Sequence, residues 1–180
     1  GMWIRFLPGL LKARELIESG AIGCVRRVRG ELCYRNKYDP QSRMFDKALG
    51  GGASLDLGVY PLSLCMFLFG EPKQISGTWH AAPSGVDASA RFHLIYQPFG
   101  PNLITFDADL MTSINMDGGN VFEVEGTEGV LRVESPFIQG KTVRVLRGKA
   151  AKTGLLRPPL DRAMSRLEKL AARLPLPGQK

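Results

Sequence analysis

The stretch that decides the fold is GGGASLDLGVYPLSLCMFLFG, residues 50–70. Three glycines open it, and the segment then reads as a helix to about Phe69 with apolar side chains on nearly every side. A helix that is apolar all round is a buried helix, here one packed against a sheet, and Gly70 is a natural C-terminal stop. Asp56, a carboxylate in this apolar setting, is therefore a residue to explain.

The residues that follow this helix alternate between apolar and polar side chains, which is the pattern of β-strands. Six strands are predicted, at residues 74–81, 86–97, 103–111, 120–125, 130–134 and 142–146. Their links are short, and the tight link 126–129 reads as a hairpin turn. Consecutive strands with short links favour antiparallel pairing, because a parallel crossover needs a dozen or more residues.

The residues before the glycines predict a helix, a strand and a loop. The helix runs from Pro8 to Ser19 and ends at Gly20. Residues 27–34 alternate as a half-buried strand, and the polar stretch 36–49 is a long loop.

Together these segments predict an α+β domain over residues 1–148, with two layers: an open, mostly antiparallel sheet and helices packed on one face. Residues 149–180 predict a basic helical C-terminal segment, with its helix at about 160–174. A dinucleotide-binding fold needs a strand, a glycine-rich turn and a helix in a parallel unit. The triplet at Gly50 lacks the third spaced glycine and follows a polar loop, so no Rossmann domain is predicted in this chain.

Composition excludes several classes of protein. The chain has 180 residues, 44% of them hydrophobic and 23% charged, which is ordinary for a globular domain. Its net charge is +7, but residues 152–180 hold seven basic and two acidic side chains and so carry most of it. Charge gathered in a tail without a nucleic-acid motif does not predict nucleic-acid binding. The sequence shows no run of about 20 apolar residues, so no membrane span is predicted.

The cysteines and histidines predict no metal site. Cys24, Cys33 and Cys65 match neither a zinc nor a redox spacing, and we interpret them as free thiols in a reducing cytoplasm. His80 and His93 are the only histidines, and neither has a carboxylate at ligand spacing along the chain.

Six short motifs resemble, in order and spacing, those of the Gfo/Idh/MocA oxidoreductases. They are residues 2–8 (MWIRFLP), 19–23 (SGAIG), 43–46 (RMFD), 50–61 (GGGASLDLGVYP), 125–129 (EGTEG) and 135–137 (SPF). Within the family the sequence is most similar to the dihydrodiol and xylose dehydrogenase branch, which carries tyrosine at the position of Tyr60 where inositol dehydrogenase carries histidine. The resemblance covers roughly residues 2–138 and weakens in the tail.

The resemblance implies a two-domain enzyme of which this chain is the substrate side. In the family an N-terminal Rossmann domain binds NAD or NADP, and the second domain covers the nicotinamide and forms a dimer through its sheet. The catalytic lysine of the family lies in a Glu-Lys-Pro motif just upstream of the segment that contains Trp3. We therefore expect the chain to be cut at both ends, to lack that lysine and, alone, neither to bind NAD(P) nor to turn over substrate.

Asp56 and Tyr60 are the candidate catalytic residues. They lie four apart and so share a helix face. Hydride transfer at a carbinol carbon requires a proton to leave or join its oxygen, and a tyrosine beside a cation can exchange that proton. Asp56 then orients the pair or holds a substrate hydroxyl. From spacing alone the alternative is preferred, with Asp56 capping the helix start and Tyr60 a packed aromatic; the resemblance reverses that order.

Four further residues are candidate substrate contacts, because the resemblance places them at the domain junction or on the loop before the glycines: Trp3, Arg5, Arg43 and Phe45. Tryptophan suits an apolar ring or sugar face and arginine a polar oxygen. The alternatives are interdomain packing for Trp3 and an ordinary solvated loop for Arg43 and Phe45.

The predicted function is that of the substrate-binding and dimerisation domain of an NAD(P)-dependent dehydrogenase acting on a CH–OH group of a diol, sugar or polyol. The alternative is a noncatalytic dimerisation or ligand-binding module. A homodimer is expected because few charges lie across Phe92, Leu94 and Tyr96, which leaves a sheet face to cover. Alternation alone does not say which face meets the helices.

Overall fold

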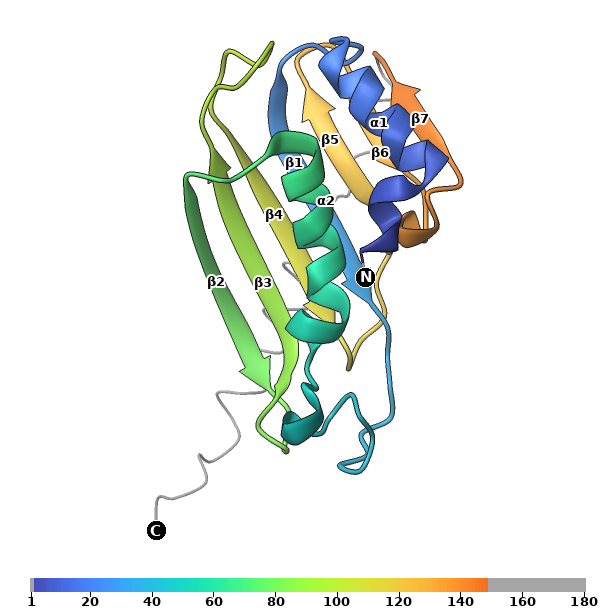
Figure 1. The fold of residues 1–180 in the computed structure, drawn as a ribbon, viewed down its shortest axis with the longest axis vertical. Coiled ribbons are helices and arrows are strands. Elements are labelled where there is room, and N and C mark those ends of the chain that lie inside the picture. Colours follow the sequence, from blue (N-terminus) through green and yellow to red (C-terminus); the bar gives the residue numbers. More distant parts are fainter. Residues whose placement is uncertain (1, 149–180) are drawn as a thin grey trace.

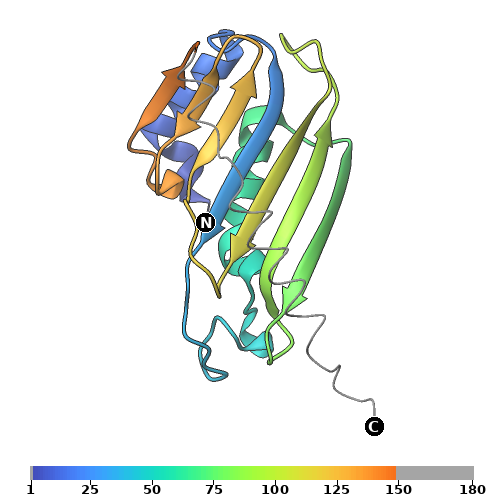
Figure 2. The same cartoon turned by 180° about the vertical axis from the view of Figure 1, so that it is seen from behind.

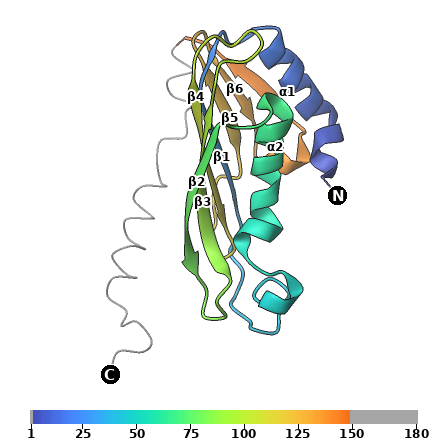
Figure 3. The same ribbon diagram turned by 60° about the vertical axis from the view of Figure 1, so that its left-hand side comes forward.

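A seven-stranded sheet with two helices on one face forms the domain (Figure 1). The computed structural model describes residues 2–148, so the expected basic segment 149–180 lies outside the described residues. The elements are α1 (Pro8–Glu18), β1 (Val25–Cys33), α2 (Val59–Phe69), β2 (Gln74–Ala81), β3 (Asp87–Tyr96), β4 (Phe106–Ser113), β5 (Phe122–Gly126), β6 (Val130–Val133) and β7 (Val143–Leu146). Figure 3 shows α1 and α2 on the same side of the sheet. The predicted α+β class is confirmed.

The strand order is β2-β3-β4-β1-β5-β6-β7, and every neighbouring pair is antiparallel except β1 with β4. After β1 the chain crosses the helical layer through α2 and enters the sheet at its far edge as β2 (Figure 1). It returns through β3 and β4 until β4 lies beside β1. The long loop and α2 supply the connection that a parallel pair requires. The short links predicted antiparallel pairing. The one parallel pair, β1 with β4, follows from the long connection between β1 and β2.

Helix α2 is the centre of the core, as its composition predicts. Leu64 and Cys65 are fully buried, and the ring of Phe69 packs edge-on to Tyr96 and Phe106 at 5.7 and 5.2 Å between centroids. The helical run Lys47–Phe69 is, contrary to expectation, long and apolar enough to cross a membrane by length and composition. Its most apolar 18-residue window is 56% buried within the protein, and a buried core helix meets the same criteria, so we interpret it as one.

The two faces of the sheet differ in chemistry, and burial shows which of them meets the helices. Leu94 and Tyr96 point to the helices and are 0% and 1% exposed, so the face that they share with Phe92 is already covered. The opposite face, seen in Figure 2, carries no helix within residues 2–148. On that face the strand register aligns one row of charged and polar side chains: Ser76, His93, Asp109, Arg29, Glu123, Arg132 and Arg144. We call this the open face.

Candidate functional site

The glycine triplet packs the preceding loop against the start of the helix. A Cβ at Gly51 would lie 2.7–2.8 Å from the carbonyl oxygens of Arg43, Met44 and Asp46, so only glycine fits. The N–H of Gly51 donates to the Asp46 carbonyl and that of Gly52 to the Met44 carbonyl, each at 2.9 Å. These amides are therefore not available to a phosphate. The loop that carries Arg43 is held instead over the first turn of the helix.

That first turn is π-helical, over Ser54–Gly58, and continues directly into α2. Its first N–H group is bound by a residue of strand β3. The N–H and the hydroxyl of Ser54 both donate to Asp87 Oδ2, at 2.6 and 2.7 Å. The alternative in which Asp56 caps this turn is therefore wrong, because Asp87 of β3 is the cap and the Asp56 side chain points elsewhere.

Asp56 forms an ion pair with Arg43. The Asp56 side chain is 19% exposed, whereas that of Arg43 is 58% exposed, so the pair sits at the surface with its carboxylate partly shielded. Both residues are sequence-predicted site residues, and the structure brings them together. The pairing itself was not predicted, since it depends on how the loop folds back over the triplet.

Tyr60 lies one turn beyond Asp56 and contacts Trp3. The two rings meet edge to face, with centroids 6.3 Å apart and an interplanar angle of 67°. The next turn of α2 carries Ser63, whose Oγ accepts a hydrogen bond of 2.7 Å from Arg5 Nε. Trp3 and Arg5 come from the 3-10 turn Trp3–Phe6, which lies against α2. Sequence reasoning missed Ser63, although its place three residues after Tyr60 on an apolar helix was a signal.

Together these side chains form one surface on the helical layer, which we call the α2 surface: Trp3, Arg5, Arg43, Asp56, Tyr60 and Ser63. Two aromatic rings of the 3-10 turn are exposed here, with Trp3 at 45% and Phe6 at 80%.

Phe45 is not part of the α2 surface. It is 2% exposed, belongs to the core, and packs edge-on to Tyr38 with 5.1 Å between centroids. Phe45 is thus buried, although Arg43, two residues before it, is exposed. Phe45 is therefore neither a surface substrate contact nor part of a solvated loop. A short aromatic motif in a polar loop gave no sign that the loop folds inward.

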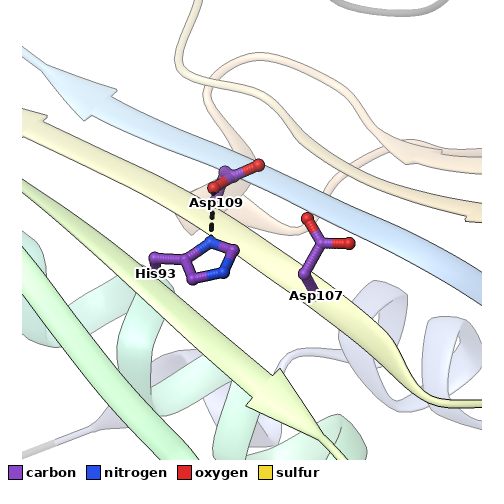
Figure 4. A group of neighbouring side chains, drawn as sticks. All are labelled: His93, Asp107 and Asp109. Carbon is purple, nitrogen blue, oxygen red and sulfur yellow. Dashed lines mark hydrogen bonds and ion pairs between the residues drawn. The ribbon is translucent and has the colours of Figure 1, made fainter.

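The histidine expectation also changes. His93 Nδ1 lies 2.9 Å from a carboxylate oxygen of Asp109, and Asp107 lies close by (Figure 4). Neither aspartate is near His93 along the chain, because the contact is made across β3 and β4. His80 stands on β2, in register with Ser89.

Comparison with known proteins gives a consistent assignment. A sequence profile of the GFO/IDH/MocA C-terminal domain matches residues 10–132. Among curated relatives, trans-1,2-dihydrobenzene-1,2-diol dehydrogenase of Bos taurus is 31% identical over 137 residues, covering 75% of this chain and 38% of that protein. The scyllo-inositol 2-dehydrogenase (NADP(+)) IolU of Bacillus subtilis is 29% identical over 136 residues, covering 72% and 39%. The chain thus spans about two fifths of the length of these relatives.

Solved structures share the fold. Aldose-aldose oxidoreductase from Caulobacter crescentus, complexed with glycerol, superimposes with a TM-score of 0.66 at 24% identity, covering 82% of this chain and 44% of that one. The apo form of levoglucosan dehydrogenase gives a TM-score of 0.64 at 19% identity, covering 89% and 51%.

Proposed function

The chain belongs to the GFO/IDH/MocA family through that family's C-terminal domain, and on this premise we propose that it is the substrate side of an NAD(P)-dependent oxidoreductase. The proposed reaction converts a CH–OH group of a diol, sugar or polyol to a carbonyl, or the reverse. The relatives named as dihydrodiol and inositol dehydrogenases support this class of substrate.

The observation that carries the proposal is the α2 surface. A polyol presents hydroxyl groups on a framework of C–H bonds, so its site needs polar groups beside an apolar ring. Here the Trp3 ring contacts Tyr60, with the Arg5–Ser63 pair on one side and the Arg43–Asp56 pair on the other. In this proposal Trp3 packs on the C–H face, while Arg43 and Asp56 bind hydroxyls.

Tyr60 is the proposed proton-exchanging group. When bound, NAD or NADP exchanges a hydride with the carbinol carbon, and the hydroxyl of that carbon must lose or gain a proton in the same reaction. In the oxidation direction Tyr60 would accept this proton as its phenolate and become the neutral phenol, and in the reduction direction the phenol would return it; Asp56, held by Arg43, orients the substrate. No nucleotide site is assigned to residues 2–148, since the glycine amides are already bonded to the loop. The exposed rings of Trp3 and Phe6 fit a covering domain that brings the cofactor.

Two titrations of the chain test this proposal. The indole N–H signals of its two tryptophans, Trp3 and Trp79, are followed by NMR while trans-1,2-cyclohexanediol or scyllo-inositol is added. We expect the Trp3 signal to move at millimolar polyol, the Trp79 signal to stay, and Asp56→Asn to weaken the response. A response at Trp79 alone would count against the site.

Calorimetric titration with NAD(H) and NADP(H) is expected to give no heat. Micromolar binding of either nucleotide would overturn the assignment of the chain to the substrate side of the enzyme.

We propose further that two copies pair through the open face. Its central row runs His93, Asp109, Arg29, Glu123 and Arg132, so acidic and basic positions alternate across the strands. A two-fold axis that lies in the interface, parallel to the strands and between β4 and β1, sets Asp109 of each copy opposite Arg29 of the other. Light scattering is expected to give twice the chain mass of 19.7 kDa. Arg29→Glu should shift the mass toward the monomer, whereas Lys12→Glu on α1 should not; a wild-type monomer would exclude this interface.

The free thiols support a cytoplasmic location. Among residues 2–148 all three cysteines are unpaired, and two of them are buried. Reduced cysteines are typical of proteins that work in a reducing compartment.

A further inference from the structure

His93, Asp107 and Asp109 form a cluster on the open face, on the opposite side of the sheet from the α2 surface (Figure 4). His93 comes from β3 and both aspartates from β4. The register pairs His93 with Asp109. Asp107 lies two residues before Asp109 in β4 and therefore on the same face. Three ligand-bearing side chains therefore stand on two hydrogen-bonded strands, which fix their spacing.

The spacing of the cluster suits one metal ion. The His93 nitrogen and the Asp109 oxygen are 2.9 Å apart, and one ligand atom from each of the three residues lies within 4.8 Å of the others. Zinc binds imidazole nitrogen and carboxylate oxygen at about 2.0–2.2 Å, so two adjacent ligands of one ion lie roughly 3 Å apart. The cluster needs little movement to take an ion between its members.

Arginines flank the cluster, and their positions decide whether it can hold a cation. Arg27 Nε lies 3.4 Å from Asp107 Oδ2, and Arg29 is in register with Asp109 on β1. Both belong to β1, whereas His93 belongs to β3, so the arginines and the imidazole come from the two strands on either side of β4. The Arg27–Asp107 pair is partly exposed, with side chains 44% and 29% accessible, and such pairs contribute at most about 1 kcal/mol.

The ligand chemistry selects the kind of ion. One imidazole and two carboxylates favour borderline transition metals such as Zn²⁺, Co²⁺ and Ni²⁺ over Ca²⁺ or Mg²⁺, which prefer oxygen ligands alone. In the single chain the His93 and Asp109 side chains are 43% and 55% exposed, which leaves water to fill the remaining coordination positions. Where two open faces pair, the ion would lie between the two copies. We propose that His93, Asp107 and Asp109 bind one divalent transition-metal ion of the zinc class on the open face.

The test uses the full chain without an affinity tag, because added histidines would bind the same ions. Zn²⁺ is titrated by calorimetry, and Co²⁺ by its visible absorption, into the wild type, His93→Gln, Asp109→Asn and His80→Gln. His80 is the only other histidine of the chain, so His80→Gln is the matched control. We expect one ion per chain at micromolar affinity, weakened at least tenfold by His93→Gln or Asp109→Asn and unchanged by His80→Gln.

Two outcomes would overturn the proposal. One is the absence of binding below 1 mM in a wild type that circular dichroism shows to be folded. The other is equal binding by the wild type and His93→Gln, which would place the ion elsewhere on the chain. Since the replaced side chains are half exposed, both variants should fold, and their spectra should match that of the wild type. The proposal does not depend on the assignment of the α2 surface.

Discussion

The carboxylate of Asp87 accepts two hydrogen bonds from Ser54, one from its backbone N–H at 2.6 Å and one from its hydroxyl at 2.7 Å. The two residues are 33 positions apart, so a strand residue supplies the cap that a helix start usually obtains from its own neighbours. Gly52, at φ +118°, lets the chain pass close to this carboxylate. The turn that presents Asp56 is therefore positioned by β3.

Replacing this cap should destabilise the domain. Asp87→Ala removes the acceptor for two donors in a partly buried place, and we expect a loss of about 1–3 kcal/mol in the free energy of unfolding. Ser54→Ala is the matched control, because it removes the hydroxyl and keeps the backbone bond, so its cost should be smaller. Urea unfolding of both variants measures the difference, and equal costs would show that the backbone bond contributes little.

The Arg43–Asp56 pair should matter more to ligand binding than to stability. Because the Arg43 side chain is 58% exposed, water screens the pair, and a double-mutant cycle with Arg43→Gln and Asp56→Asn should give a coupling of at most ~1 kcal/mol. The same variants should reduce the polyol response of Trp3. A coupling well above that value with an unchanged response would make the pair a structural element.

The three cysteines should differ in reactivity. Burial, with a smaller contribution from the Glu31 carboxylate, raises the pKa of Cys33 to about 12, and burial also raises the pKa of Cys65. Cys24 is partly exposed. At pH 8 a disulfide reagent should modify Cys24 quickly. It should modify Cys33 and Cys65 only as fast as the domain opens. Mass mapping identifies the fast site, and rapid labelling of Cys33 would contradict its burial.

Alkaline pH should destabilise the fold. The thiol of Cys33 is neutral in the folded domain up to a pKa of about 12, against an ordinary value near 9. The unfolded chain thus loses this proton first, and stability is complete below about pH 9 and falls as the pH rises toward 12. Tyr96, whose pKa burial also raises, acts in the same direction. Urea midpoints from pH 8 to 10.5 should decline, and less steeply in Cys33→Ala.

The helices and strands could be predicted from the local sequence. Their arrangement in the sheet could be predicted only in part. Strand β2 has the predicted bounds, Gln74–Ala81, because alternation and its flanking residues are local signals. Contacts that depend on which strands become neighbours left no local trace. The Ser54–Asp87 bonds, the His93–Asp109 contact and the parallel pairing of β1 with β4 are of this kind.

The same distinction holds for the candidate site. Trp3 and Tyr60 were predicted by resemblance, and the structure places their rings in contact. Phe45 was predicted in the same way and lies in the core. A motif identifies residue types at positions, whereas the packing of a loop decides whether a side chain faces outward. The chemical roles of Asp56 and Tyr60 remain predictions.

The parallel pairing of β1 has a consequence for how the domain folds. Val28, in the middle of the sheet, has Ala108 and Val124 as its neighbours, and both are synthesised long after it. The local units, β2–β3–β4 and β5–β6–β7, can form early as meanders, but neither contains the strand that joins them. Closing the sheet around β1 therefore requires large loops to be ordered first, which slows folding. We expect β1 to be the last strand to dock, and the nascent chain to stay incomplete until β5 has left the ribosome.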